Sequence, residues 1–242
     1  MRSLGRVDLS TYVRAVPLLL RNPSIALAPL LAAVAQILLF MLLPADAGSG
    51  FLGAANSSIS GLVAQLITGF GFGVALIVAE AAWRRGRAPF DTAWEEAQRK
   101  AGGILLATIG LGFIVYVAGL VGSILPGFGS IFLVLIAYFF FIYTIPAAAI
   151  GGFPGSAALQ ASLETARRAP LATLIVMVVY VFTFAYLPTL VVDLLQPLLL
   201  GTSIFASGVV SSLLVAAVKA VVTGYVALVL AKTYDDASYG RY

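Results

Sequence analysis

Residues 126–170, PGFGSIFLVLIAYFFFIYTIPAAAIGGFPGSAALQASLETARRAP, contain the pattern that decides the fold of this chain. The stretch opens with a Pro-Gly turn and continues as an aromatic-rich apolar run up to Ile150. A Gly-Gly pair interrupts the run, and a short amphipathic segment then leads to Arg167 and Arg168, just before the next apolar run. An apolar run of about 20 residues is long enough to cross the hydrocarbon core of a bilayer. The stretch therefore predicts one membrane crossing, a return to the interface and the start of a second crossing.

The remainder of the chain repeats this pattern. Of its 242 residues, 61% are hydrophobic and 10% are charged, whereas soluble domains carry about 25% charged residues. We therefore expect a single all-α integral membrane domain over residues 1–242, with six transmembrane helices. The apolar runs that predict these helices lie at 24–43, 60–82, 103–121, 130–150, 170–192 and 207–231.

The composition also excludes several kinds of chemistry. The chain contains no cysteine and no histidine. Disulfides, thiolate nucleophiles and Cys/His metal sites are therefore excluded, as is general-base catalysis by histidine. Because no nucleophile–base pair or metal-ligand cluster stands out among the remaining residues, we expect a non-enzymatic protein without catalytic residues, metal site or cofactor.

The positions of the basic residues predict an orientation. Every Lys and Arg except Lys219 lies at a terminus or in every second connection between the apolar runs. The other three connections, at 45–59, 122–129 and 193–206, contain none. Because Lys and Arg mark the cytoplasmic side, both termini are predicted to be cytoplasmic. The same basic face would attract anionic lipid, so the expected partner is the bilayer and not nucleic acid.

Each pair of crossings is expected to form a hairpin that is entered through a short amphipathic helix in the cytoplasmic interface. Such a helix keeps its apolar side in the headgroup region and its basic side in water. In the second of them, Thr92 and Glu95 have the spacing of a capping box. The three helices are predicted at 8–21, 91–101 and 156–168.

The three hairpins also suggest an internal repeat. Arg21-Asn22-Pro23, Lys100-Ala101-Gly102 and Arg168-Ala169-Pro170 occupy the same place, between an interfacial helix and a crossing. Internal repeats are common in membrane transport folds. However, any three hairpins with cytoplasmic starts would look similar, so duplication and coincidence both stay open.

The last part of the chain contains more apolar sequence than two crossings need. From Pro170 to Ala231 the chain is almost continuously apolar. Residues 193–206 are therefore expected to form an excursion on the outer side. Both an interfacial helix and a re-entrant loop fit, because irregular backbone at membrane depth must be covered by protein.

Residues 124–170 resemble a bacterial membrane family. The shared features are the Pro-Gly turn, the aromatic-rich run and an Ala-Leu-x-x-Ser-Leu helix, here Ala158-Leu159 and Ser162-Leu163. The family is the integral-membrane domain fused to some glycerophosphoryl diester phosphodiesterases, together with its stand-alone relatives. The resemblance implies a helical membrane fold in the bacterial inner membrane. It implies no reaction, because the chain contains no phosphodiesterase domain and has Ile150-Gly151-Gly152 where the family has an acidic residue.

Four polar residues within or near the apolar runs are candidates for a site. Lys219 falls near the bilayer centre, where a charge is expensive and commonly functional, although its long stem could also reach polar neighbours or water. Glu80 could pair with Lys219, or with Arg84 one helical turn away. Gln36 and Gln65 could contact a ligand, but such amides more often form hydrogen bonds between helices.

Two functions of different class fit these features. In the first, the protein handles or transports a lipid or small molecule at a polar site that includes Lys219. In the second, it is a structural or assembly subunit of a larger membrane complex, or a homo-oligomer, whose glycine-rich faces dock on partners. Transport predicts that Lys219→Met abolishes activity in a folded protein, whereas a structural role predicts that the variant fails to accumulate.

Overall fold

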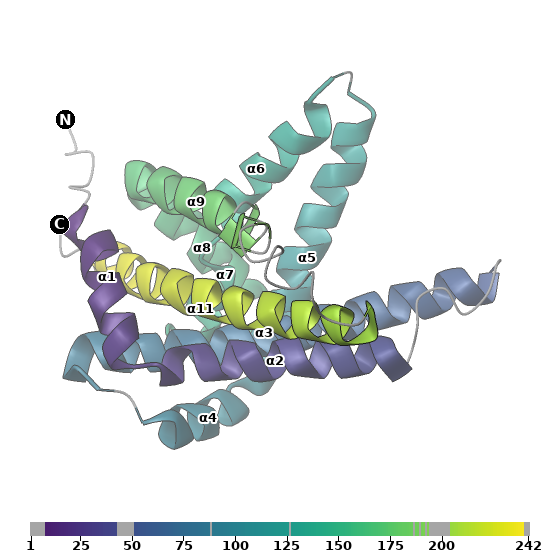
Figure 1. Cartoon of the computed structure of the whole chain (residues 1–242). Coiled ribbons are helices and arrows are strands. Elements are labelled where there is room, and N and C mark those ends of the chain that lie inside the picture. The colour runs from purple at the N-terminus through teal and green to yellow at the C-terminus, as the bar shows by residue number, and fades with distance from the viewer. Residues whose placement is uncertain are drawn as a thin grey trace.

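A computed structural model describes residues 8–42, 51–87, 89–125, 127–185, 187–188, 190–191, 193 and 204–239, with the backbone alone at 51–57, 185, 204–211 and 239. These residues form helices and short connections and include no strand. Five helical segments are long and apolar enough to cross a membrane, and a bent pair of helices raises the number to six if it counts as one crossing. The chain is therefore an all-α, multi-pass membrane protein, as predicted (Figure 1).

The helices alternate between long apolar ones and short amphipathic ones, as the sequence pattern predicts. In chain order they are α1 (Ser10–Arg21), α2 (Ser24–Leu42), α3 (Phe51–Arg85), α4 (Phe90–Arg99), α5 (Ala101–Ser123), α6 (Gly129–Phe141), α7 (Thr144–Ala149), α8 (Ser156–Arg168), α9 (Pro170–Ala185) and α11 (Ile204–Tyr239).

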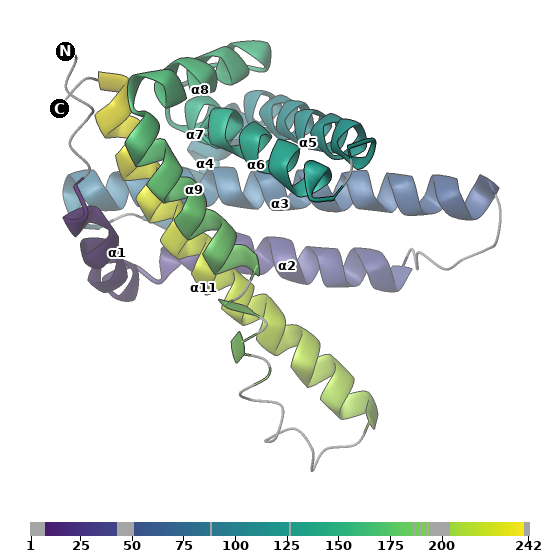
Figure 2. The same cartoon turned by 90° about the horizontal axis from the view of Figure 1, so that it is seen from above.

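Three pairs of long helices lie side by side, α2 with α3, α5 with α6, and α9 with α11, and α11 also packs against α2 and α3. The pairs pack together on the side of the molecule where α1 lies, and they diverge away from it. In Figure 1 the axes of α5 and α6 point away from those of α2 and α3. In Figure 2 the axes of α9 and α11 do so. We call the shared end the base and the diverging remainder the open half. The hairpins themselves stay a prediction, because parts of the connections within each pair lie outside the described residues.

The buried core lies in the base. In α3, every residue from Val74 to Ala79 is buried, and in α11 the same holds from Val226 to Ala231. The six residues of α7 are all buried, whereas α6 buries only Ala137. The apolar surface of the open half is instead left for lipid, which solvates it as well as another helix would.

Hydrogen bonds to backbone carbonyls join the helix ends within the base. The indole N–H of Trp83 donates to Leu228 C=O at 2.9 Å, which links α3 to α11. Lys100 Nζ donates to Ala149 C=O at 2.8 Å, which links the start of α5 to the end of α7. These carbonyls belong to helix ends or crossing points where a donor from another helix is able to reach them.

The three short amphipathic helices all belong to the base. α1 contacts α11, α4 contacts α3, and α8 contacts α5, α6 and α7. The second begins at Phe90 and ends at Arg99, so the expected range 91–101 is displaced by one or two residues. The expected capping box is wrong, because the Thr92 hydroxyl donates to Pro89 C=O at 3.1 Å instead of accepting from an N–H group at the helix start.

The residues that join each short amphipathic helix to the crossing after it have backbone conformations that can be compared. Asn22 has φ −129° and ψ 68°, and Ala169 has φ −129° and ψ 63°. Lys100 differs, with φ −97° and ψ 5°. Proline follows Asn22 and Ala169 but not Lys100, and a following proline disfavours the α-helical region for the residue before it. The first and third units thus share one local geometry, which is compatible with duplication and equally with two independent X-Pro breaks.

The fourth apolar run forms one segment long enough to cross a membrane, Gly129–Ala149, as predicted for 130–150, although its helix is not continuous. It is broken at Ile142 and Tyr143, between α6 and α7. Pro146 explains the position of the break, because it has no N–H to donate to Ile142 C=O and its ring crowds the same turn. The buried Ser162 of α8 bridges the break: its hydroxyl donates to Phe140 C=O at 3.0 Å and accepts from the Tyr143 N–H at 3.1 Å.

The last two crossings differ from their predicted bounds. α9 begins at Pro170 as expected and runs to Ala185, and the described residues 187–188, 190–191 and 193 are helical as well. α11 runs from Ile204 to Tyr239, well beyond the predicted end at Ala231. Its charged last turns continue the helix because Lys232 pairs with Asp236 at 2.6 Å, one turn on. The choice between an interfacial and a re-entrant excursion lies outside the described residues, since 194–203 are not among them.

Candidate functional site

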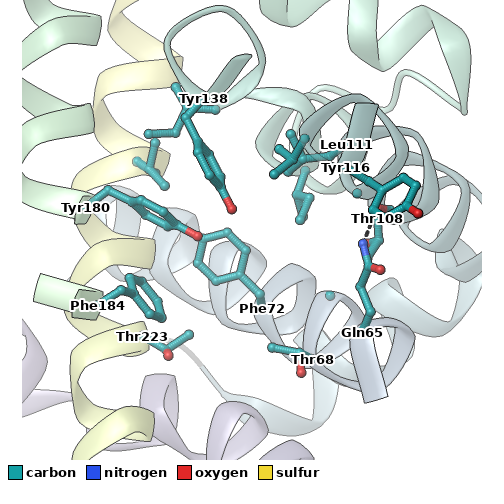
Figure 3. Close-up of a pocket in the computed structure, with 16 residues that line it drawn as sticks. Gln65, Thr68, Phe72, Thr108, Leu111, Tyr116, Tyr138, Tyr180, Phe184 and Thr223 are labelled. Atoms are coloured by element: carbon teal, nitrogen blue, oxygen red, sulfur yellow. Dashed lines mark hydrogen bonds between the residues drawn. The ribbon is translucent and has the colours of Figure 1, made fainter. Parts of the chain in front are cut away.

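The three helix pairs enclose a cavity where they begin to diverge. Its volume is about 480 Å³. α3, α5, α6, α7, α9 and α11 all contribute to its wall, so every pair takes part (Figure 3). The lining residues are Gln65, Thr68, Gly69, Phe72, Thr108, Leu111, Gly112, Val115, Tyr116, Tyr138, Ile142, Ile145, Tyr180, Phe184, Thr223 and Leu230.

Small residues on α3 fix one wall of the cavity. A Cβ atom at Gly69 would collide with the side chain of Thr108, and one at Gly73 would lie 2.8 Å from Ile104 Cγ2. Both contacts are with α5. Gly69 and Gly73 are four residues apart, and such a pair of small residues lets another helix approach closely. Gly71, on the opposite side of α3, faces Ala28 and Ala32 of α2 in the same way.

An amide and a hydroxyl form the polar part of this wall. Gln65 Nε2 donates to Thr108 C=O at 3.2 Å, which joins α3 to α5 (Figure 3). Gly112 leaves room for this amide, because a Cβ atom there would overlap Gln65 Nε2. The Thr108 hydroxyl is occupied by Ile104 C=O at 2.8 Å. The Gln65 side-chain oxygen is an acceptor for which no described residue provides a hydrogen bond.

Two tyrosines from different pairs meet across the opposite wall. The rings of Tyr138 in α6 and Tyr180 in α9 have centroids 5.5 Å apart. Figure 3 shows both hydroxyl groups turned toward the middle of the cavity, next to the ring of Phe72. Phe184 extends this surface, since its ring lies 4.7 Å from that of Tyr180. The tyrosines thus present an aromatic surface with two hydroxyl groups to the same space.

The helix break between α6 and α7 forms part of the lining. Tyr138 precedes the break, Ile142 lies in it and Ile145 follows it, and all three line the cavity. Because Pro146 cannot donate to the Ile142 carbonyl, the backbone of this stretch has fewer helical hydrogen bonds than that of a continuous helix. Broken helices at membrane depth occur where they are buried in protein or line a cavity.

None of the described residues that line the cavity is charged. Its polar groups are hydroxyls and one amide, and most of the wall is aromatic or aliphatic. Because a charge taken out of water without a partner is strongly unfavourable, the arrangement suits an uncharged group. The site can therefore bind an apolar body that carries a hydroxyl, carbonyl or ester.

The structure brings together only part of the predicted polar site. Gln65 lines the cavity, and Gln36 lies one helix away, where its Nε2 donates to Ala64 C=O at 2.9 Å and to the Thr68 hydroxyl. Both amides therefore form hydrogen bonds between helices. Thr68 is the connection between them, because it receives the bond from Gln36 and also lines the cavity.

Glu80 and Lys219 lie elsewhere. Glu80 forms an ion pair with Arg84 at 2.7 Å, and the same arginine lies 3.5 Å from Asp235 of α11. The alternative pair of Glu80 with Lys219 is therefore absent from the described contacts. The Lys219 side chain is exposed and is not part of the cavity lining; its carbonyl accepts from the Thr223 hydroxyl at 2.7 Å.

Several lining residues were not predicted as site residues. Tyr138 belongs to the aromatic run at 138–143, which suggests packing or a lipid-facing surface. Tyr180, Phe72 and Thr108 are single polar or aromatic residues within apolar runs, and nothing in their spacing shows that they face one another. The one sequence feature that could have indicated this part of the site is Pro146, because a proline inside a crossing predicts a break in the helix.

Among the described residues, no three acidic side chains lie close enough together to hold a metal ion. No family model matches the chain, and no curated protein or solved structure is significantly similar to it. The resemblance of residues 124–170 to the phosphodiesterase-associated membrane domain thus stays a prediction.

Proposed function

We propose that this protein is a non-enzymatic membrane protein that handles or transports a lipid or apolar small molecule, whose uncharged part occupies the cavity between the helix pairs. One observation carries the proposal: all three pairs contribute to a single aromatic-lined cavity without charge. Ligand pockets are typically mainly apolar, with a few polar groups that set orientation. Here those groups are Gln65, Tyr138 and Tyr180.

The position of the cavity supports a lipid more than a soluble metabolite. The cavity lies where the helix pairs separate, so its surroundings in a membrane are acyl chains rather than water. Phe72 and Phe184 provide the flat apolar surfaces against which a chain or ring would pack. A hydroxyl or ester carbonyl of the ligand would reach Tyr138 or Tyr180.

We further propose that the base is cytoplasmic and that the membrane is a bacterial inner membrane, with the chain related to the phosphodiesterase-associated membrane domain. The described basic residues other than Lys219 belong to α1, α4, α8 and the base ends of α3 and α11, or lie in the connections on either side of α4. This distribution is the one that the positive-inside rule associates with the cytoplasm.

An assembly role is the alternative function. It depends on glycine-rich faces that are free to dock on a partner. The three glycines Gly69, Gly71 and Gly73 are already used, since they face α5 and α2 of the same chain. The cavity, in contrast, is not filled by any of the residues that the structure describes, so it favours ligand handling.

Native mass spectrometry of the gently solubilised protein tests the proposal. The matched variants are Val115→Trp, which fills the cavity from α5, and Val117→Trp on the same helix, where the side chain is 38% exposed and lies outside the cavity lining. We expect the wild type and Val117→Trp to retain one lipid-sized molecule, and Val115→Trp to lose it.

Retention of the same molecule by Val115→Trp, or no retained molecule in any of the three proteins, would overturn the proposal. A stoichiometric protein partner that is bound equally by all three variants, without a lipid, would support the assembly role instead. Equal yield and thermal stability of the two tryptophan variants are the control for folding.

A further inference from the structure

A groove lies at the base, at the Arg85 end of α3 and beyond the residues of this helix that line the cavity. It has a volume of about 310 Å³ and runs between α1 and the end of α3. From α1 it is lined by Arg14, Pro17, Leu18 and Arg21, which lie within two turns on one side of the helix. Trp83 and Gly86 form its opposite wall. The two guanidinium groups thus share one concave surface.

The other faces of α1 show how this groove meets the membrane. Leu9, Val13, Val16 and Leu20 form a separate stripe at helical spacing, and each of them is highly exposed. Thr11, Ala15 and Asn22 form a third, buried face against the protein. An exposed apolar stripe beside a basic face is the pattern of a helix that lies in the plane of the interface. The groove is therefore expected at the depth of the lipid headgroups.

The two arginines have no carboxylate at ion-pair distance among the described residues, in contrast to four other basic residues of the base, Arg84 among them. Arg168 pairs with Glu164, Lys100 with Glu96, and Lys232 with Asp236. The acidic residue that interacts with Arg14 is Asp8, at the start of α1. Hydrogen bonds from the Ser10 side chain and N–H, helped by the Arg14 charge, hold the pKa of Asp8 below its usual value. Even with Asp8 ionised, the two groove arginines leave a net positive charge.

The walls of the groove are held in place by hydrogen bonds. The buried Asn22 donates from Nδ2 to Leu18 C=O at 3.1 Å and to Gly86 C=O at 3.2 Å, which fastens α1 to the end of α3. Gly86 has φ +73°, a conformation that glycine adopts without strain. The Trp83 indole is fixed by its bond to Leu228. The groove is therefore a formed surface and not a pair of independent side chains.

We infer that this groove binds the phosphate of an anionic lipid headgroup, with Arg14 and Arg21 as the ligating side chains. Arginine matches phosphate oxygens with two parallel N–H donors. The adjacent apolar stripe of α1 would contact the acyl chains of the same lipid, which a free phosphate ion lacks. Trp83 would lie beside the glycerol region, as aromatic residues at the headgroup level do. This site is independent of the proposed function, because the groove and the cavity share no lining residue.

The test is a lipid titration of the purified full chain in detergent, followed by native mass spectrometry. The probes are phosphatidylglycerol and phosphatidylcholine with identical acyl chains. The groove variant is Arg14→Gln with Arg21→Gln. Its charge-matched control is Arg99→Gln with Arg167→Gln, which removes exposed arginines in the last turns of α4 and α8. We expect the groove variant to bind phosphatidylglycerol about tenfold more weakly, since two charge-assisted contacts are lost.

The control pair is expected to bind both lipids as the wild type does, and Val115→Trp is expected to leave phosphatidylglycerol binding unchanged. An equal loss in the control pair would overturn the inference, because it would show attraction to net charge alone. Equal wild-type affinity for the two lipids would overturn it as well. Competition by inorganic phosphate at a concentration comparable to that of the lipid would show a site for a soluble anion instead. If the glutamine variant does not fold, Arg14→Lys with Arg21→Lys keeps the charge and is still expected to weaken binding.

Discussion

The base and the open half of α3 are both apolar, but they are surrounded differently. From Val74 to Ala79 every residue is buried, whereas between Ser58 and Thr68 only Ser60 and Ala64 are. α11 shows the same difference, since Ala216 and Ala220 are its only buried residues between Ser212 and Val221. Apolar character alone therefore does not decide which part of a crossing is packed.

Small residues and hydrogen bonds account for the difference. Inside a bilayer, lipid solvates apolar side chains as well as another helix does, so helices associate through close packing and polar contacts. The base has both, with Gly73 against α5 and donors from Trp83, Lys100 and Ser162 to carbonyls of other helices. In the open half such contacts lie within a pair, as between Gln36 and Thr68 or between Gly122 and Ser130. The cavity lies at the transition, where the wall is held by the base and the space opens toward lipid.

The largest expected effect comes from Gly69→Leu compared with Gly61→Leu on the same helix. A Cβ atom at Gly69 would collide with Thr108, whose hydroxyl is tied to Ile104 C=O, so α5 must move. We expect a loss of about 1–3 kcal/mol in the free energy of unfolding, as for overpacked cores. At Gly61 a Cβ atom meets nothing within 4 Å, and we expect a change within about 0.5 kcal/mol. Unfolding in mixed micelles of increasing SDS content measures both.

Equal destabilisation by the two leucines would contradict the comparison, since it would mean that the open half of α3 is packed as tightly as the base. A useful further control is Gly69→Ala, which adds only the colliding atom. Its effect should have the same sign as that of leucine and should be smaller.

The next effect is that of Ser162→Ala. This change leaves the Tyr143 N–H and the Phe140 C=O without their partner in a buried break. A buried backbone group without a hydrogen bond costs about 1–3 kcal/mol. The control is Ser123→Ala in the open half, whose exposed hydroxyl donates to Leu120 C=O at 2.7 Å and where we expect about 0.5 kcal/mol or less. Thermal unfolding compares the variants, and hydrogen exchange at the Tyr143 amide locates the change. Slow exchange at that amide in the alanine variant would contradict the role of Ser162.

The sequence predicts the elements of this molecule better than their contacts. Membrane class, the order of long and short helices and the starts at Ser24, Ser156 and Pro170 follow from composition, helical periodicity and X-Pro breaks. The role of Ser162 does not, because a serine in an amphipathic helix looks the same whether it faces water or a broken neighbour. Pro146 predicts a break in the helix, but it does not predict which side chain forms hydrogen bonds with the backbone groups at the break.

The candidate site shows the same limit. Gln65 is visible from the sequence because an amide is rare in an apolar run. Tyr138 and Tyr180 are 42 residues apart in the sequence, yet their rings are in contact. Whether two such rings meet depends on how far the helix pairs diverge. That divergence is set by contacts in the base, which periodicity within one helix does not encode.

A smaller effect is expected for Gln36→Leu, a polar contact of the open half. Gln36 joins α2 to the Ala64 carbonyl and the Thr68 hydroxyl of α3. Hydrogen bonds between transmembrane helices contribute about 0.6 kcal/mol on average, so we expect a loss of this order in SDS unfolding. A loss above about 2 kcal/mol, comparable with the core changes of the base, would show that the two halves of the α2–α3 pair are equally constrained.

The smallest effect is expected for Lys219→Met, although the sequence alone makes Lys219 the most conspicuous residue. Its side chain is exposed on the open half of α11 and does not line the cavity. When helices separate within a membrane, each stays in lipid, so an exposed side chain has similar surroundings in both states and contributes little to the unfolding free energy. We expect Lys219→Met to accumulate normally, to unfold within about 0.5 kcal/mol of the wild type and to retain the cavity ligand. Loss of that ligand in a folded Lys219→Met protein would move the functional centre from the cavity to the outer surface of α11.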